Sequence, residues 1–262
     1  MDLGLAKKTV IVTGGGSNVG RGIALAFARE GANVVIADID EKQGQKVVAE
    51  AAAAGKGGRG LVIKTDATNV ESVQAMVQKV LQEFGQIDVL VNNAGGGLAS
   101  KLLVEQRMED LQKEVNINFW TAVNCSRAVL PHMAKRDKGA IVNLSSAAGK
   151  IGDGHMAIYA STKGAIIALT KSVAKEYILT GIRANCICPG LIVPEGRDQI
   201  GSGSVWGQWI DVFDEKGQKE FLKTKGVARV GRPNDVGNLA VFLASDCSSY
   251  VNGQAIDRKS VV

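Results

Sequence analysis

Short apolar runs rich in β-branched residues recur along the chain, and each is separated from the next by a longer stretch with helical periodicity. Runs such as Val10-Ile11-Val12 are apolar on both faces, which is typical of parallel strands that helices cover on two sides. The alternation predicts an α/β fold with a doubly wound parallel sheet. The predicted strands are Thr9–Thr13, Asn33–Ala37, Leu61–Lys64, Val89–Val91, Ala140–Leu144 and Arg183–Ile187.

The length and composition fit one globular unit. The chain has 262 residues, and α/β folds of about 200–250 residues often form a single domain. Apolar residues make up 45% and charged residues 22%, so we predict one domain over residues 1–262. No apolar run approaches the roughly 18 residues of a membrane span, and no apolar signal region opens the chain. We therefore expect a cytoplasmic protein with no membrane contact.

Charge and cysteine content argue against two other classes of site. The net charge is +5, but the lysines and arginines are scattered rather than arranged in stripes with aromatic residues, so we expect no nucleic-acid partner. The cysteines form no CxxC pair and have no histidine-rich partner set, which predicts buried, reduced thiols and no metal site. They are Cys125, Cys186, Cys188 and Cys247.

Residues 194–226 interrupt the alternation of strands and helices. The segment contains Gly196, Gly201, Gly203, Gly207 and Gly217, with Trp206, Trp209 and Phe213 among them. Glycines mixed with aromatic residues in a long insertion predict a mobile lid over a substrate site.

A glycine-rich turn follows the first predicted strand. The turn Gly14-Gly15-Gly16-Ser17-Asn18-Val19-Gly20 leads into a helical face of Ile23, Ala26 and Phe27. Glycines let the backbone approach phosphate groups, and the helix N-terminus adds N–H donors and positive potential. The pattern predicts a pyrophosphate site.

Asp38 ends the second strand, 24 positions beyond Gly14, where a carboxylate can accept hydrogen bonds from both ribose hydroxyls. The same charge would repel the 2′-phosphate of NADP, and position 39 holds Ile39 rather than a basic residue. The cofactor predicted here is NAD. The alternative is that Asp38 caps the next helix.

Tyr159 and Lys163 stand at i and i+4, and this spacing places a phenol and an ammonium on one helix face. A unit charge ~4 Å away contributes about 4 kcal/mol at an effective dielectric of 20, enough to bring a phenol pKa towards neutral pH. The preceding strand ends in Ser145-Ser146, at the sheet edge where doubly wound folds bind ligands.

Together these motifs resemble the short-chain dehydrogenase/reductase family, from about Thr9 to about Ile256. The resemblance rests on Thr13-Gly14 to Gly20, on Asn92-Asn93-Ala94-Gly95 and on Pro189-Gly190. It implies a Rossmann-type dinucleotide-binding and catalytic domain with the catalytic set Asn116, Ser146, Tyr159 and Lys163. In that set Ser146 would bind the substrate oxygen, Lys163 the nicotinamide ribose, and Asn116 a proton-relay water.

The resemblance also implies a set of cofactor contacts along the carboxyl ends of the strands. These are Gly14, Ser17, Asn18, Val19, Gly20, Asp38, Ile39, Asp66, Ala67, Asn93, Ala94, Gly95, Tyr159, Lys163, Pro189, Gly190 and Ile192.

Departures from the family pattern occur at three places. Asn18 replaces a glycine, so either Asn18 takes a left-handed backbone or the turn adjusts. Pro194 replaces a threonine that commonly binds the nicotinamide carboxamide, so backbone groups near Ile192 must do so. The C-terminal Ile256-Asp257-Arg258-Lys259-Ser260 replaces an acidic, double-glycine ending that usually contributes to oligomer contacts.

We therefore predict an NAD(H)-dependent interconversion of a secondary alcohol, cyclic or aryl, and its ketone, with Tyr159 as acid and base. The resemblance also implies a homotetramer or dimer through the helices that carry Asn116 and Tyr159. Alternatives are a 3-oxoacyl thioester reductase using NADPH, whose turn usually has an arginine where this chain has Ser17, and a catalytically silent nicotinamide-binding regulator. The predicted, mostly apolar pocket is formed by Gly96, Leu98, Ala147, His155, Met156, Ile192, Trp206 and Trp209.

Overall fold

A seven-stranded parallel sheet forms the centre of the protein, with strand order β3-β2-β1-β4-β5-β6-β7. This computed structural model describes residues 2–98, 100–201, 204, 206–211, 215–225 and 229–258. The topology confirms the predicted Rossmann-type, doubly wound α/β fold. The strands are β1 Thr9–Thr13, β2 Asn33–Asp38, β3 Gly60–Lys64, β4 Val89–Asn92, β5 Gly139–Leu144, β6 Ile182–Pro189 and β7 Ala255–Arg258.

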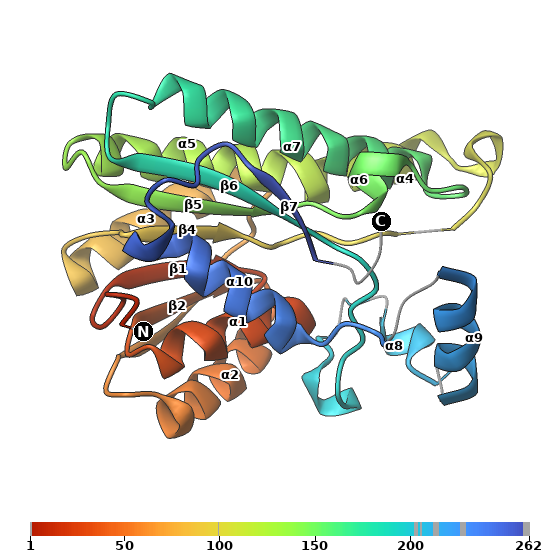
Figure 1. The fold of residues 1–262 in the computed structure, drawn as a ribbon, viewed down its shortest axis with the longest axis horizontal. Helices are drawn as coiled ribbons and strands as arrows, with labels where there is room; N and C mark the ends of the chain where they lie inside the picture. The colour runs from red at the N-terminus through yellow and green to blue at the C-terminus, as the bar shows by residue number, and fades with distance from the viewer. Residues whose placement is uncertain are drawn as a thin grey trace.

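Helices cover both faces of the sheet (Figure 1). Helices α1, α2 and α10 lie on one face, and α3, α5 and α7 lie on the other. The helices are α1 Asn18–Arg29, α2 Glu41–Ala54, α3 Val70–Phe84, α4 Met108–Val115, α5 Thr121–Ala134, α6 Ala148–Ile151, α7 Ala157–Glu176, α8 Trp206–Trp209, α9 Glu215–Lys225 and α10 Pro233–Ala244. Short turns of other types are η1 Leu103–Glu105, the π-helical η2 Asn116–Trp120, η3 Arg197–Gln199 and η4 Asp246–Ser248.

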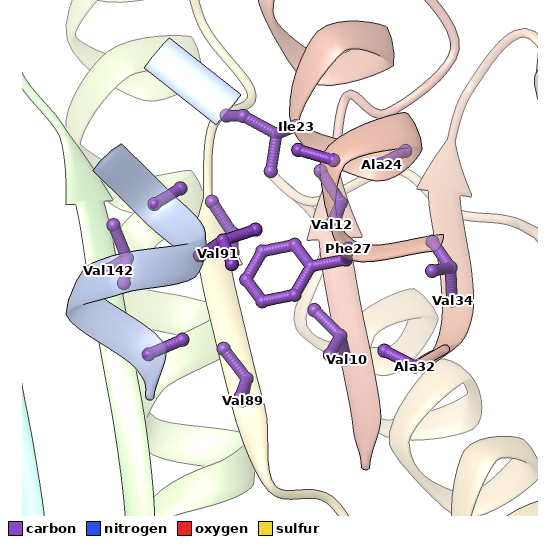
Figure 2. Packing of buried hydrophobic residues seen from close by; sticks show 14 of the residues in the cluster. Val10, Val12, Ile23, Ala24, Phe27, Ala32, Val34, Val89, Val91 and Val142 are labelled. Carbon is purple, nitrogen blue, oxygen red and sulfur yellow. The ribbon is translucent and has the colours of Figure 1, made fainter. Parts of the chain in front are cut away.

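Alternate residues of each strand pack into opposite layers. Val10 and Val12 of β1 belong to the cluster beneath α1, where the Phe27 ring lies between β1 and β4 (Figure 2). Ile11 belongs to the cluster on the other face, with Met76 of α3. These five side chains are fully buried. Burying each of them contributes roughly 1.5–3 kcal/mol to the stability of the fold. The doubly apolar runs of the sequence therefore reflect two separate cores.

A chain of buried polar side chains crosses the layers near the middle of the sheet. Asn92 Nδ2 donates to Asn143 Oδ1 at 2.8 Å and to Ser126 Oγ at 3.0 Å. Asn143 Nδ2 then donates to Thr170 Oγ1 at 2.8 Å, and Thr170 Oγ1 donates to the Ile166 carbonyl at 2.7 Å. This row of hydrogen bonds joins β4, β5, α5 and α7. It therefore fixes α7, the helix that carries Tyr159, against the sheet.

The strand order reverses between β1 and β4, which pair with each other although β2 and β3 intervene in sequence. In such sheets ligands bind in the crevice beyond the carboxyl ends of the strands at the reversal point. Most of the predicted cofactor residues lie at or just beyond the carboxyl ends of β1 to β6, at this edge of the sheet. The segment that carries α8 and α9 also leaves β6 here (Figure 1).

Three further findings concern the classes of site considered from composition. In the described ranges no helix combines the length and apolarity needed to span a membrane. The same ranges hold no group of three or more histidine, cysteine, aspartate or glutamate side chains placed to bind a metal ion. Cys125, Cys186 and Cys188 are buried free thiols as predicted, but Cys247 is exposed because it lies in a surface turn after α10.

Candidate active site

The glycine-rich turn between β1 and α1 has the shape of a phosphate cradle. A Cβ on Gly20 would lie 2.0 Å from the Gly14 carbonyl oxygen, so position 20 accepts no side chain. Gly14 itself has φ +61°, in the left-handed region that glycine adopts readily. Helix α1 begins at Asn18, and its first N–H groups have no partner within the helix. The residues present therefore fit a dinucleotide pyrophosphate.

Asn18 takes over the conformation of the glycine that it replaces. Its φ is +39°, which confirms the left-handed alternative stated from the sequence. Asparagine tolerates this region better than most side chains. Among the described residues, no hydrogen-bond partner reaches its buried Oδ1 atom. An unpaired acceptor beside the turn fits a ligand that brings a hydroxyl or N–H donor.

Asp38 joins the end of β2 to this turn. Its Oδ2 accepts a 2.8 Å hydrogen bond from the Gly16 N–H, and its Oδ1 accepts a 2.9 Å bond from the Asp40 N–H. The cap of α2 is Asp40, whose Oδ1 accepts from the Gln43 N–H at 3.1 Å. The alternative that Asp38 caps this helix is therefore wrong. The Asp38 carboxylate is fixed beside the cradle, with lone pairs still available to ribose hydroxyls.

The end of β4 is tied to the end of β1 on the other side of the cradle. Thr13 Oγ1 accepts from the backbone N–H groups of Asn93 and Ala94 at 3.0 and 3.1 Å. Asn93 Nδ2 donates to the Thr13 and Gly14 carbonyls at 2.9 Å each. Gly95 follows with φ +142°, and a Cβ there would lie 2.6 Å from Asn118 Oδ1. The predicted Asn93–Gly95 segment is thus a fixed wall of the crevice.

The other predicted cofactor residues also lie at this edge. Asp66 follows β3 and is exposed, with its Oδ1 accepting from the Thr68 N–H at 2.9 Å. The remaining ones lie in the turn, in the first turn of α1, at the last residue of β6 or just after a strand: Ser17, Val19, Ile39, Ala67, Pro189, Gly190 and Ile192. Pro194 is buried two residues beyond Ile192, and the Val193 N–H is already bonded to the Gly231 carbonyl at 3.0 Å.

Tyr159 and Lys163 lie one turn apart on α7, and Ser146 follows β5. Lys163 Nζ lies 5.7 Å from the centroid of the Tyr159 ring and donates a 3.1 Å hydrogen bond to the Leu144 carbonyl. The Lys163 side chain is buried, and a hydrogen bond links Tyr159 to Ser146. The structure therefore brings together the phenol, the ammonium and the hydroxyl named from the sequence.

Burial shifts the two titrating groups of this pair in opposite directions. It raises the pKa of Tyr159; the hydrogen bond to Ser146 lowers this pKa, and the charges of Glu114 and Asp153 raise it. Burial lowers the pKa of Lys163 to about 8. The spacing of Tyr159 and Lys163 predicts a lowered Tyr159 pKa, but loss of hydration dominates in the structure and raises it. Lys163 is therefore the group of the pair that exchanges its proton closer to neutral pH.

The predicted Asn116 is separated from this cluster. Its side chain is exposed at the start of the π-helical turn η2, whereas Asn118, two residues later, is 1% exposed. Asn118 Oδ1 accepts from the Gly96 N–H, and its Nδ2 donates to the Gly96 and Glu114 carbonyls, each at 3.0 Å. A π-type turn shifts the backbone ladder by one residue and is frequent at functional sites. Asn118, rather than Asn116, has the placement expected of the family's asparagine.

The predicted pocket residues are only partly brought together. Gly96 is fixed by Asn118, and a Cβ on Gly97 would lie 2.5 Å from Met156 Cε. Leu98 is 37% exposed, and Ala147 and Met156 are half-buried. His155 is exposed with φ +66°, and its carbonyl accepts from the Lys101 N–H. Trp206 is half-buried at the start of α8, and the Trp209 side chain lies outside the described side chains.

Two buried polar residues at the site gave no signal in the sequence. Glu114 of α4 is 2% exposed, and its Oε1 accepts from the Leu98 N–H at 2.9 Å. Gln43 of α2 donates through Nε2 to the Asp198 and Ile200 carbonyls at 3.3 and 3.2 Å. The start of the predicted lid is therefore fastened to the cofactor half of the crevice. Glutamate and glutamine on helices are usually solvated, so the sequence pattern predicts a buried role for neither residue.

Known proteins resemble the chain over almost its whole length. The family model described as Enoyl-(Acyl carrier protein) reductase matches residues 14–258. The 3-oxoacyl-(acyl-carrier-protein) reductase FabG of Chlamydia pneumoniae is 36% identical over 256 residues, which cover 98% of this chain and 97% of that protein. Oxidoreductase UcpA of Salmonella typhimurium is 39% identical over 250 residues, with coverages of 95% and 92%.

Solved structures agree with these relatives. NAD+-bound xylitol dehydrogenase superposes with a TM-score of 0.86 at 30% identity, covering 98% of this chain and 99% of that one. Levodione reductase superposes with a TM-score of 0.88 at 28% identity, with coverages of 98% and 97%. The cradle at β1, the Tyr159–Lys163 pair on α7, and the matched length have one common explanation. The chain is an oxidoreductase of the short-chain dehydrogenase/reductase family.

Proposed function

We propose that the protein is an NAD(H)-dependent oxidoreductase that interconverts a secondary alcohol, cyclic or aryl, with its ketone. The observation that supports NAD is the placement of Asp38, whose carboxylate is held at the cradle by Gly16. A 2′-phosphate at this place would meet a fixed negative charge. One structural relative is an NAD+-bound xylitol dehydrogenase, and another is a levodione reductase. The substrates of these two relatives are not thereby substrates of this chain.

The side chains around Tyr159 account for the movement of the proton. A bound nicotinamide would supply the hydride acceptor or donor. Ser146 steadies the substrate oxygen, and Tyr159 takes the hydroxyl proton in oxidation and returns it in reduction. Lys163, with its pKa lowered to about 8, carries the proton away from the phenol. We assign the role of the family's asparagine to Asn118 rather than to Asn116, because Asn118 is the buried asparagine beside Gly96.

A second candidate function is the reduction of a 3-oxoacyl thioester with NADPH. The observation that favours it is the 36% identity to FabG of Chlamydia pneumoniae, together with the family model's description. Against it stand Asp38 at the cradle and Ser17 at the position where such reductases usually carry an arginine. The two candidates differ in both cofactor and substrate, so one assay separates them.

A homotetramer or dimer through the helices near Asn116 and Tyr159 is part of the proposal. Large apolar side chains on this side remain exposed, with Met108 at 64% and Trp120 at 46%. Exposed large apolar groups on one helical stretch, here α4 and η2, are typical of subunit interfaces. Sedimentation of the purified protein tests the assembly.

The decisive experiment is a screen that follows the absorbance of the reduced nicotinamide. NAD with cyclic, aryl and polyol secondary alcohols forms one arm, and NADPH with a 3-oxoacyl thioester forms the other. Turnover in the first arm alone supports the proposal, and turnover in the second alone replaces it with the reductase. Calorimetric cofactor binding with no turnover in either arm would identify a silent regulator.

A further inference from the structure

Glu114 is a buried carboxylate inside the candidate site. It is the one buried residue of α4, and its side chain is 2% exposed. Among the described residues, its carboxylate has a single hydrogen bond, from the Leu98 N–H to Oε1 at 2.9 Å, and no ion pair. Glutamate is almost never fully buried unless it is paired, because removing the charge from water is costly. Burial of this kind points to a role beyond packing.

Glu114 and Asn118 hold the two ends of one short segment. Their positions differ by four, so they share a face of the continuous α4 and η2 helix. Asn118 binds both the N–H and the carbonyl of Gly96, while Glu114 binds the N–H of Leu98. The Asn118 amide also donates to the Glu114 carbonyl at 3.0 Å. The Gly96–Leu98 segment, which forms a wall of the predicted pocket, is thus bound to this helix at both ends.

The same carboxylate lies in the electrostatic surroundings of Tyr159. The charged groups that act on this phenol come from three elements: Glu114 from α4, Asp153 from the loop before α7, and Lys163 from α7 itself. Burial is the main cause of the raised pKa of Tyr159, and the charges of Glu114 and Asp153 add to it. A nearby negative charge disfavours the phenolate, so Glu114 opposes the deprotonation that alcohol oxidation requires.

We propose that Glu114 is a positioning residue that fixes the Gly96–Leu98 wall of the substrate pocket through the Leu98 N–H. A second effect accompanies the first, because a negative charge near Tyr159 disfavours its phenolate form. The proposal rests on the proposed function only for the role of Tyr159 as acid and base. The two effects can be separated chemically. Glutamine at position 114 keeps an oxygen that can accept the Leu98 N–H but removes the charge. Alanine removes both the acceptor oxygen and the charge.

The experiment therefore compares Glu114→Gln, Glu114→Ala and the control Glu109→Gln. Glu109 is exposed on the same helix, so its variant removes an equal charge from α4 without touching the pocket. We expect Glu114→Gln to keep KM for the alcohol and to move the acidic limb of kcat/KM to lower pH. Glu114→Ala should move the same limb and also raise KM about tenfold, because the wall loses its anchor. Glu109→Gln should change neither quantity.

An optical titration makes the test independent of turnover. The absorbance of the phenolate is followed with pH in the parent protein and in Tyr159→Phe, and the difference isolates Tyr159. The same pair of measurements is made on proteins that also carry Glu114→Gln. In this background the phenolate absorbance of Tyr159 should appear at lower pH. Circular dichroism checks that the fold is intact. A titration that coincides with the parent's would overturn the electrostatic effect, and a KM unchanged in Glu114→Ala would overturn the positioning effect. If no alcohol is a substrate, the proposed function is refuted, while the titration still decides the electrostatic effect of Glu114.

Discussion

The N–H of Gly16 donates a 2.8 Å hydrogen bond to Oδ2 of Asp38, so the glycine-rich turn and the end of β2 share one carboxylate. The bond crosses between β1 and β2, whose strands pair in parallel up to Thr13 and Ala37. A Cβ on Gly16 would lie 2.9 Å from the same oxygen, which explains the glycine at that position. The residue that would select the cofactor is therefore also a structural part of the cradle.

Removal of the Asp38 carboxylate should change cofactor preference. Hydrogen bonds to a charged group contribute about 1.5–3 kcal/mol, so Asp38→Ala should lower kcat/KM with NAD by roughly tenfold to a hundredfold. The ratio of NADP to NAD efficiency should rise, because the repulsion of the 2′-phosphate is lost. Steady-state kinetics with both cofactors measure the ratio. Asp40→Ala is the control: it removes the α2 cap, costs about 1 kcal/mol of stability and should leave the ratio unchanged.

Loss of the Tyr159 hydroxyl should abolish most of the turnover. General acid and base groups contribute about 10²–10⁴-fold, and Tyr159→Phe should lose at least that much in kcat. The cofactor dissociation constant, measured by calorimetry, should stay nearly the same. Tyr177→Phe makes the same chemical change at the other end of α7 and should retain activity. Normal turnover in Tyr159→Phe would refute the assignment.

The buried Lys163 should cost stability at neutral pH. Its pKa falls from 10.5 to about 8 on folding, equivalent to about 3 kcal/mol. Because the folded state binds the proton less tightly, this penalty is complete below about pH 8 and is relieved as pH rises to 10.5. The neutral variant Lys163→Met should therefore gain stability over the parent by up to about 3 kcal/mol at pH 7, and less as pH rises.

Urea unfolding at several pH values measures that difference. Lys171→Met, on the exposed side of α7, is the matched control and should show no comparable pH-dependent gain. A stability difference between Lys163→Met and the parent that does not vary with pH would contradict the prediction.

The left-handed backbone at Asn18 predicts which side chains the turn accepts. Asn18→Val should destabilise the protein by about 1–2 kcal/mol, because a β-branched residue is strained at φ +39°. Asn18→Gly should stay within about 0.5 kcal/mol of the parent, since glycine adopts this φ freely. Thermal unfolding measures both. Equal stability of the valine and glycine variants would show that backbone strain does not govern this position.

The sequence predicted the sheet because the strands are apolar on both faces and helices alternate with them. Strand β7 was missed by that pattern: Ala255–Arg258 contains Asp257 and lies at the sheet edge, where an apolar run is not required. The thiol of Cys247 is exposed for a local reason, its surface turn, that composition cannot reveal.

The candidate site was predictable where chemistry follows spacing, as with Tyr159 and Lys163. It was not predictable where backbone geometry decides. Asn116 and Asn118 are equally polar in sequence, and only the π-helical turn determines which of them is buried. The role of Glu114 depends on a contact with Leu98, from a distant loop, that no local pattern encodes.

The buried chain of Asn92, Asn143 and Thr170 has a consequence for how such a protein can change over time. Each side chain satisfies its neighbour across a different element, so replacing one leaves an unpaired polar group in the next. A single substitution is then harmful, while a matched pair can be tolerated. Evolution at these positions must therefore be epistatic, because the three residues accept mutation only as a set. The position of helix α7 against the sheet depends on that set.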